Sequence, residues 1–249
     1  MEAVFIMLQR QVKLFFRSKP RILGSIAQPT LFLLALGLGF GPVFEQTGQV
    51  DYVQYLTPGI VGMSLLFGSM MNGMSLIWDK KFGFLKETLV APASRISLLI
   101  GRCLGGAFTS MFQGIVVLTL SALIMGYSLG HPGVIPLFII IMLMVAMLFS
   151  LLGTIIASRV DDFEAFPTVM NFLIMPMFFL SGAIFPIANL PPSVIAVTQI
   201  NPMTYGVNLL RDTMNLEWST SNITDAAVLL GIIALLLIIG SRVFKTIET

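Results

Sequence analysis

The amino-acid sequence predicts an all-α integral membrane protein with six transmembrane helices. Of its 249 residues, 56% are hydrophobic and only 10% are charged, and the mean hydropathy is +0.94. Ordinary soluble domains carry about 25% charged residues. The stretch from Cys103 to Ser158 contains no Asp, Glu, Lys or Arg at all. A segment of that length without charge is typical of a chain whose solvent is lipid.

Six apolar runs are long enough to cross a bilayer. A hydrocarbon core of about 30 Å needs roughly 20 apolar residues per helix. Runs of this kind occupy residues 22–40, 56–77, 104–126, 134–157, 166–185 and 226–244. No soluble domain fits between them. We therefore expect one transmembrane domain over residues 1–249.

Basic residues lie almost wholly on one side of these spans. All but one of the 14 Lys and Arg residues fall in the N-terminal arm, the loops after the second and fourth spans, or the C-terminal tail. Only Arg211 falls on the other side, among acidic residues. Because cytoplasmic loops retain positive charge, we expect a multi-pass protein of the cell (inner) membrane with both termini cytoplasmic. An odd number of spans would break this pattern.

Residues 1–20 form an amphipathic segment and are not a seventh span. Val4, Leu8 and Phe15 fall on one side of a helical wheel, and Arg10 and Arg17 fall opposite. This pattern predicts a basic helix that lies in the cytoplasmic interface. It is either a plain surface anchor or an elbow that also touches a cytoplasmic partner.

The polar insert "DKKFGFLKETLVAPASR", residues 79–95, predicts a short cytoplasmic helix between spans two and three. Phe82, Leu85 and Leu89 recur at i, i+3 and i+7, and Pro92 ends the periodicity. A loop whose charge only fixes topology would need no such spacing. An exposed apolar stripe indicates a docking surface instead. The sequence has no G-x-x-x-x-G-K-[ST] motif, so any energy from nucleotides must come from a partner.

A proline-broken segment follows the fifth span. Pro186, Pro191, Pro192 and Pro202 divide it into pieces too short to cross a bilayer. Asn201 is placed as an N-cap with Pro202 at the first helical position. We expect residues 187–210 to form an outer re-entrant region that acts as a gate. The alternative is a structured extracellular loop without a transport role.

Other residues carry weaker signals. Gln28 and Asn72 lie inside predicted spans, where a polar group needs a partner, and are candidates for lining a cavity or bonding across helices. The 16 methionines lack Cys or His company and fit flexible packing better than a soft-metal site, so no metal site is expected. A net charge of +2 gives no reason to expect nucleic-acid binding.

Three stretches together resemble the membrane subunit of an ABC-2 type exporter. These are "YLTPGIVGMSLL" at 55–66, "KETLVAPASRISLLIGR" at 86–102, and the two parts of "LSGAIFPIANLPP...INPMTYGVNLLR" at 180–211. The family includes permeases for drug efflux and for polysaccharide or lipo-oligosaccharide export. The resemblance covers nearly the whole chain, in the expected order.

The resemblance implies partners and site residues. The helix with Glu87, Thr88, Leu89 and Pro92 would contact a separate cytoplasmic ATP-binding subunit, together with the apolar Phe82 and Leu85. The outer re-entrant region would include Gly182, Pro186, Pro191, Asn201, Pro202, Tyr205 and Arg211. The permease would pair with itself or a close relative within membrane lipid. It would bind no cofactor, because ATP and Mg would sit on the partner.

The implied activity is ATP-driven movement of an amphipathic substrate, such as a lipid, glycolipid or drug, from the cytoplasm or inner leaflet outward. The alternative is an ATP-independent secondary transporter or channel. Such a carrier is expected to place ionisable groups at mid-membrane, yet the third and fourth predicted spans have none. An intramembrane enzyme is disfavoured because there is no H-E-x-x-H or G-x-S-x-G motif and only one His.

Overall fold

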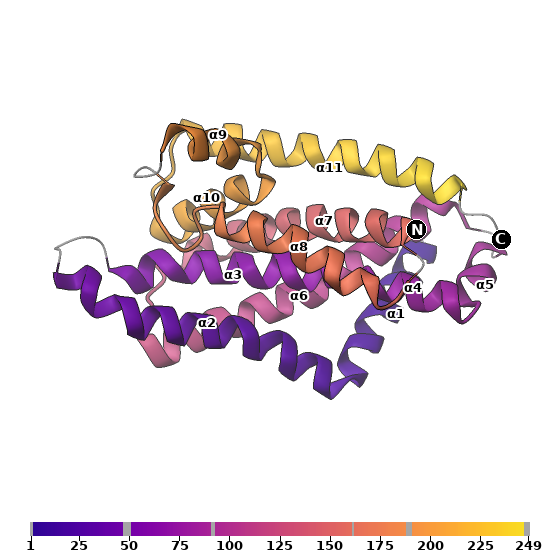
Figure 1. The fold of residues 1–249 in the computed structure, drawn as a ribbon, viewed down its shortest axis with the longest axis horizontal. Coiled ribbons are helices and arrows are strands. Elements are labelled where there is room, and N and C mark those ends of the chain that lie inside the picture. The colour runs from indigo at the N-terminus through magenta and orange to yellow at the C-terminus, as the bar shows by residue number, and fades with distance from the viewer. Residues whose placement is uncertain (1, 47–50, 91–92, 161, 188–190, 247–249) are drawn as a thin grey trace.

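The computed structural model describes residues 2–46, 51–90, 93–160, 162–187 and 191–246, and these ranges contain helices and no strand (Figure 1). The helices are α1 (Glu2–Arg17), α2 (Lys19–Gln46), α3 (Tyr52–Met71), α4 (Met74–Lys81), α5 (Phe84–Val90), α6 (Arg95–Met125), the short 3-10 turn η1 (Pro132–Val134), α7 (Ile135–Arg159), α8 (Ala165–Phe179), α9 (Pro192–Ile200), α10 (Pro202–Asn215) and α11 (Thr220–Thr246). The prediction of an all-α fold is confirmed.

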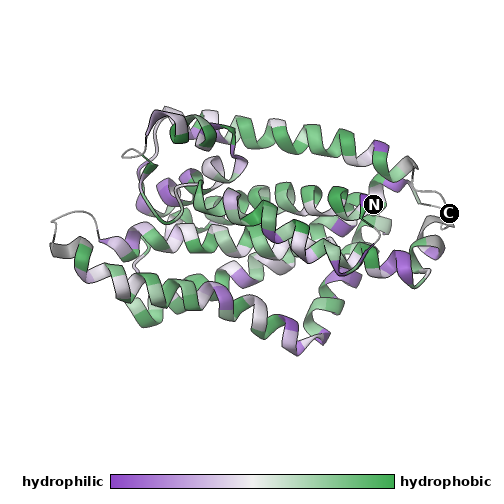
Figure 2. Cartoon of the chain, in the orientation of Figure 1, coloured by the Kyte–Doolittle hydropathy of each residue, from purple (hydrophilic) through white to green (hydrophobic). Residues whose placement is uncertain are grey.

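Five segments are long and apolar enough to cross a membrane. They are Lys19–Val43, Tyr52–Lys81, Arg95–Met125, Pro132–Arg159 and Thr220–Phe244. Figure 2 shows their hydrophobic middles side by side, with polar residues gathered toward the two ends of the long axis. The chain is therefore a multi-pass membrane protein.

Helix α3 forms the centre of the bundle. Most of its residues are buried, and it packs against α6, α7, α2 and α10. Helices α2 and α11 lie at opposite outer edges and expose most of their apolar surface (Figure 1). This surface is suited to lipid or to a second membrane subunit. The only cysteine of the sequence, Cys103, follows Arg102 in α6, is fully buried and lies 3.6 Å from the hydroxyl of Thr154.

Helix α1 crosses the bundle and packs on α6 through two glycines. Its buried residues are Met7, Gln11 and Phe15. A Cβ added to Gly101 would lie 2.6 Å from the carbonyl oxygen of Val4, and one added to Gly105 would lie 2.5 Å from the Cβ of Gln11. Small residues spaced by four let two helix backbones approach closely. The apolar side of α1 is therefore shared between α6 and the surroundings, since Phe5 and Phe16 remain exposed.

We expect Gly101→Ala to destabilise the protein by about 1–3 kcal/mol, because the clash is with α1 backbone that cannot move away without repacking. The measurement is the thermal unfolding midpoint in detergent. Gly39→Ala in α2 is the matched control, since an added Cβ there meets nothing within 4 Å. Equal unfolding midpoints for Gly101→Ala and Gly39→Ala would show that α1 does not rest on this glycine.

The boundary of the fifth predicted span is wrong. Residues 166–185 were expected to form one helix, but α8 ends at Phe179. The chain then turns at Gly182, whose φ of +75° favours glycine, and a Cβ there would lie 2.6 Å from Ile187. With 15 residues, α8 is about 22 Å long and falls short of a full hydrocarbon core.

The second predicted span is also interrupted. Helix α3 stops at Met71, and α4 continues after Asn72 and Gly73. A Cβ on Gly73 would lie 2.5 Å from the carbonyl oxygen of Gly153 in α7. The break thus occurs where the chain lies directly against the α7 backbone.

Candidate functional site

A buried ion-pair cluster joins three helices at the basic end of the bundle. Asp79 of α4 accepts hydrogen bonds from Arg10 of α1, with Nη1 to Oδ2 at 2.8 Å, and from Nη2 of Arg102 of α6. Arg102 also donates to the hydroxyl of Ser75 at 3.1 Å. The side chain of Arg102 is 1% exposed and that of Asp79 is 6% exposed, whereas Arg10 is 31% exposed.

The cluster works as a clamp on α4. A carboxylate can accept two forked guanidinium groups at once, and such charge-assisted bonds are strong and directional. The hydrogen bonds that Arg10 donates to Asp79 raise the pKa of Arg10 against the opposing effect of burial. Helix α4 is therefore held from two sides, and a displacement of α4 would pull on α1 and α6 together.

Helix α5 follows α4 after a sharp turn. Gly83 makes the turn with a φ of +80°, so the single helix expected around residues 79–91 is two helices. Trp78 and Phe82 stack with ring centroids 5.0 Å apart. The α5 end of the molecule projects beyond the bundle (Figure 1).

The predicted docking stripe is not continuous. Phe82 and Glu87 are exposed and Thr88 is partly buried, but Leu85 is only 5% exposed and belongs to the core. The expectation that Leu85 is exposed is therefore wrong, because it packs inward once the helix breaks at Gly83. The side chain of Leu89 and all of Pro92 lie outside the described residues. The coupling role of this segment stays a prediction.

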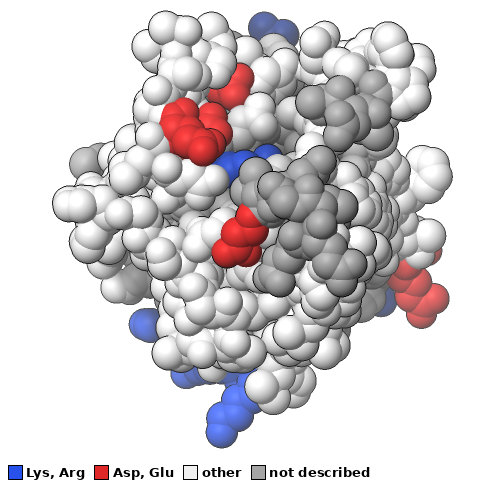
Figure 3. All heavy atoms as spheres, turned by 90° about the vertical axis from the view of Figure 1, so that its left-hand side faces the viewer, with Lys and Arg blue, Asp and Glu red and all other residues white. Residues whose placement is uncertain are grey.

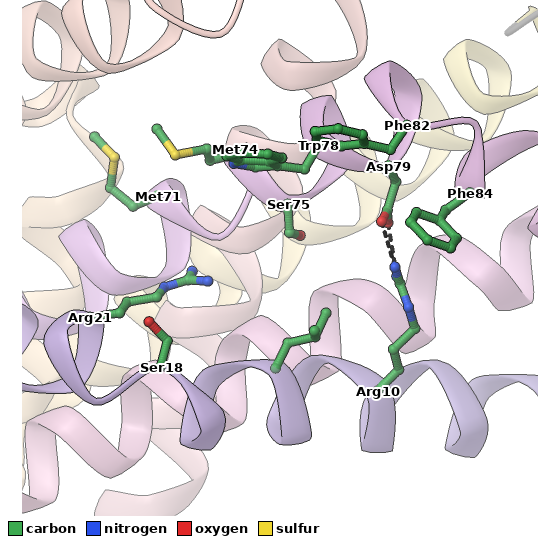
Figure 4. Close-up of a pocket in the computed structure, with 11 residues that line it drawn as sticks. Arg10, Ser18, Arg21, Met71, Met74, Ser75, Trp78, Asp79, Phe82 and Phe84 are labelled. Atoms are coloured by element: carbon green, nitrogen blue, oxygen red, sulfur yellow. Dashed lines mark hydrogen bonds and ion pairs between the residues drawn. The ribbon is translucent and has the colours of Figure 1, made fainter.

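A cavity of about 530 Å³ lies between α1, α4 and the start of α2 (Figure 4). We call it the elbow cavity, after the bend at Ser18 where α1 gives way to α2. Its polar lining consists of Arg10, Ser18, Arg21, Ser75 and Asp79. Its apolar lining consists of Leu14, Met71, Met74, Trp78, Phe82 and Phe84. The cavity thus combines positive charge with aromatic and methionine walls.

A second cavity, of about 290 Å³, adjoins the first between α2, α3 and α6. Arg21 and Met71 line both cavities. Gln28 lines the second one, as the sequence suggested. Asn72 is buried, and its amide nitrogen has no hydrogen-bond partner among the described residues. It lies against Ser150 and Gly106, since a Cβ on Gly106 would contact both side chains.

At the opposite end of the bundle, Arg211 ties α10 to α3. Its guanidinium lies 3.8 Å from the ring centroid of Tyr55 and donates to the carbonyl oxygen of Gly182 at 2.9 Å. The Tyr55 hydroxyl donates to the same carbonyl at 2.7 Å. Burial lowers the pKa of Arg211, although nearby Tyr55 and Asp212 favour the charged form. Arginine keeps its charge in this setting, so the carbonyls and ring compensate for lost water.

The proline-rich segment forms two helices that meet at Asn201. Its Oδ1 accepts from the backbone N–H of Met203, which confirms Asn201 as an N-cap with Pro202 in the first turn. Its Nδ2 donates to the carbonyl of Met177 at the end of α8. The Tyr205 hydroxyl donates to the carbonyl of Gln199 at 2.5 Å. These bonds fix α9 against α10 and α8.

The remaining predicted gate residues lie close by. Gly182 is in the turn after α8 and is held by Arg211 and Tyr55. Pro186 is partly buried beyond that turn, and Pro191 is the exposed residue before α9. Figure 3 views the molecule from this end and shows acidic groups around a recessed basic one. The structure thus brings most of the predicted gate residues into one neighbourhood.

Sequence reasoning missed the Arg10–Asp79–Arg102 cluster. These residues are 69 and 23 positions apart, and no local pattern links them. The sequence nevertheless contains a reason to look for this pair. Asp79 follows the second predicted span and Arg102 precedes the third, so both lie at the same side of the membrane. Charges at such depths need partners of opposite sign.

Comparison with known proteins agrees with this architecture. A family profile described as ABC-2 type transporter matches residues 2–215. The ycf38 transport permease of Porphyra purpurea is 26% identical over 226 residues, covering 89% of this chain and 76% of that protein. The inner membrane transport permease YadH of Escherichia coli is 26% identical over 183 residues, covering 73% and 70%. Nodulation protein J of Rhizobium leguminosarum bv. viciae is 23% identical over 195 residues, covering 78% and 74%. The match over most of its length shows that the chain belongs to the ABC-2 type transporter family.

Proposed function

We propose that this chain is the permease subunit of an ATP-driven exporter that moves an amphipathic substrate outward. Its partners are a cytoplasmic ATP-binding subunit, which carries ATP and Mg, and a second permease, identical or closely related. The five long spans and the shorter α8 together cross the membrane six times, with both termini in the cytoplasm. Segments α9 and α10 form the outer re-entrant gate.

The observation that carries this proposal is the connection of α5 to the bundle through α4. Helix α5 projects at the basic end and presents the exposed carboxylate of Glu87. Asp79 in the preceding helix binds Arg10 and Arg102. A push on α5 therefore reaches α1 and α6 through charge-assisted bonds, not through a loose loop. A partner can drive a conformational change only if it contacts the two states differently, and such a connection supplies the contact.

The distribution of polarity supports an amphipathic cargo. The described spans have long uncharged surfaces, and α2 leaves much of its apolar side uncovered. A strongly charged small ion would find little compensation along such a path. A molecule with an apolar part can instead enter from the side, next to α2.

Glu87→Lys should reduce the affinity for the cognate ATP-binding subunit by about tenfold, because reversing a charge at a complementary interface introduces repulsion. The measurement is ATPase activity of that subunit in proteoliposomes, titrated against the permease. Glu217→Lys is the control. It makes the same change of charge at an exposed residue in the turn between α10 and α11, away from α5. Unchanged coupling and transport in a folded Glu87→Lys protein would remove α5 from the ATPase interface.

A further inference from the structure

The elbow cavity has the chemistry of a site for an anionic lipid headgroup. Arg21 comes from the first turn of α2 and Ser18 from the bend before it. In Figure 4 the Arg21 guanidinium points into the space between α1 and α4, above Ser18. A guanidinium with a neighbouring hydroxyl can bind two phosphate oxygens in a forked arrangement and a third by a single bond.

Arg21 is free to accept such a ligand. The side chain is exposed, and within the described part of the chain it forms no ion pair with a carboxylate. Its guanidinium carbon lies 5.9 Å from the ring centroid of Phe15. Among the described residues that line the cavity, Asp79 is the only acidic one, and its carboxylate already binds Arg10 and Arg102. The cavity therefore carries net positive charge.

The walls of the cavity suit the glycerol and upper chain region of a lipid. Trp78, Phe82 and Phe84 expose about half of their surface at the α4 side, and Met71 and Met74 continue the apolar wall toward the membrane interior. Aromatic residues favour the headgroup level of a bilayer, where one part of the ring is wet and the other apolar. The volume of about 530 Å³ lies within the usual range for small-molecule sites.

The adjoining second cavity offers space for the rest of a ligand whose anionic group lies at Arg21. It begins at Arg21 and Met71 and continues along α2 past Gly24 and Gln28 to Phe67 of α3. Beyond Arg21, the lining that the structure describes contains no charged residue. A molecule with its anionic group at Arg21 could therefore extend an apolar part between α2 and α3.

We propose that the elbow cavity binds the phosphate group of an anionic lipid from the leaflet at the basic end, with Arg21 as the main phosphate ligand and Ser18 as a second donor. Both a resident phospholipid and a phosphorylated amphiphilic cargo offer this chemistry. The site depends on the membrane location of the chain and not on coupling to ATP, so the proposed exporter function and this site can fail separately.

The test is native mass spectrometry of the full-length chain in detergent, without nucleotide or ATP-binding subunit, titrated with phosphatidylglycerol. We expect Arg21→Ala to raise the dissociation constant of the tightest lipid adduct by about tenfold, the scale of one lost charge-assisted interaction. Arg17→Ala is the matched control, because it removes the same charge one turn earlier, from an exposed residue outside the elbow cavity, and should change binding less than about twofold. Arg21→Lys keeps the charge but loses the fork, so binding should be intermediate.

Each comparison decides the matter. Equal weakening by Arg17→Ala and Arg21→Ala would show general attraction to the surface and overturn the proposal. Equal binding of phosphatidylcholine would overturn the requirement for net negative charge. Displacement of the lipid by millimolar inorganic phosphate would mean a free-anion site and overturn the lipid assignment, whereas persistence of the adduct supports it. If Arg21→Ala fails to fold, the Arg21→Lys protein provides the same comparison against Arg17→Lys, and equal effects of these two would again overturn the proposal.

Discussion

Asp79→Leu should lower the free energy of unfolding by about 3–5 kcal/mol, among the largest effects of any single substitution in this chain. The reason is that Arg102, whose side chain is 1% exposed, would keep its charge in the bundle with the Ser75 hydroxyl as its one remaining hydrogen-bond partner among the described residues. The measurement is the thermal unfolding midpoint in detergent, and a loss of this size corresponds to about 10 °C for a protein of this length.

A second substitution separates lost pairing from lost packing. Asp79→Leu combined with Arg102→Met should recover most of the stability, because removing both partners of a buried ion pair costs far less than removing one. Arg10→Ala should cost about 1 kcal/mol or less, since Arg10 is 31% exposed and Asp79 keeps Arg102. If the double variant were less stable than Asp79→Leu alone, the buried charge would not be the cause of the loss.

Arg211→Met should loosen the turn after α8 and cost about 3 kcal/mol. The substitution removes the stacking on Tyr55 and the hydrogen bond to the Gly182 carbonyl, both in a partly buried setting. Hydrogen exchange should show faster exchange over residues 180–187 and in the last turns of α10, because Arg211 lies near the end of α10 and joins these two segments. The unfolding midpoint should fall in parallel.

Two milder variants test the same cluster. Tyr55→Phe removes only the hydroxyl that donates to Gly182 and should cost about 1 kcal/mol. Arg211→Lys keeps the charge but lacks the planar guanidinium group. The stability that it loses should therefore lie between the losses of Tyr55→Phe and Arg211→Met. Unaltered exchange over 180–187 in Arg211→Met would show that this turn is held by other contacts, such as the one between Gly59 and Ala183.

The helices could be predicted from the sequence because each long apolar run has a simple requirement. A helix satisfies its own backbone in lipid, so length and hydropathy suffice to place α2, α6, α7 and α11. The capping residue Asn201 was also predictable, because a side-chain acceptor before Pro202 is a local signal.

The breaks and clusters could not be predicted in this way. The end of α8 depends on Gly182, which has a left-handed backbone conformation and lies within an apolar run. Hydropathy carries no information about backbone conformation. The split between α3 and α4 depends on contact with Gly153, which is far away in the chain. The elbow cavity needs α1 and α4 side by side. These features arise from tertiary packing, to which a linear pattern gives no access.

The complete burial of Cys103 makes the wild-type chain a suitable background for site-directed labelling. A thiol-reactive spin label or fluorophore that reaches only accessible sulfur will leave this native residue unmodified. New cysteines at Phe172 of α8 or Ile200 of α9, both 83% exposed, can then be labelled selectively. Quenchers that partition into lipid or into water would measure the depth of each position directly, without first constructing a cysteine-free protein.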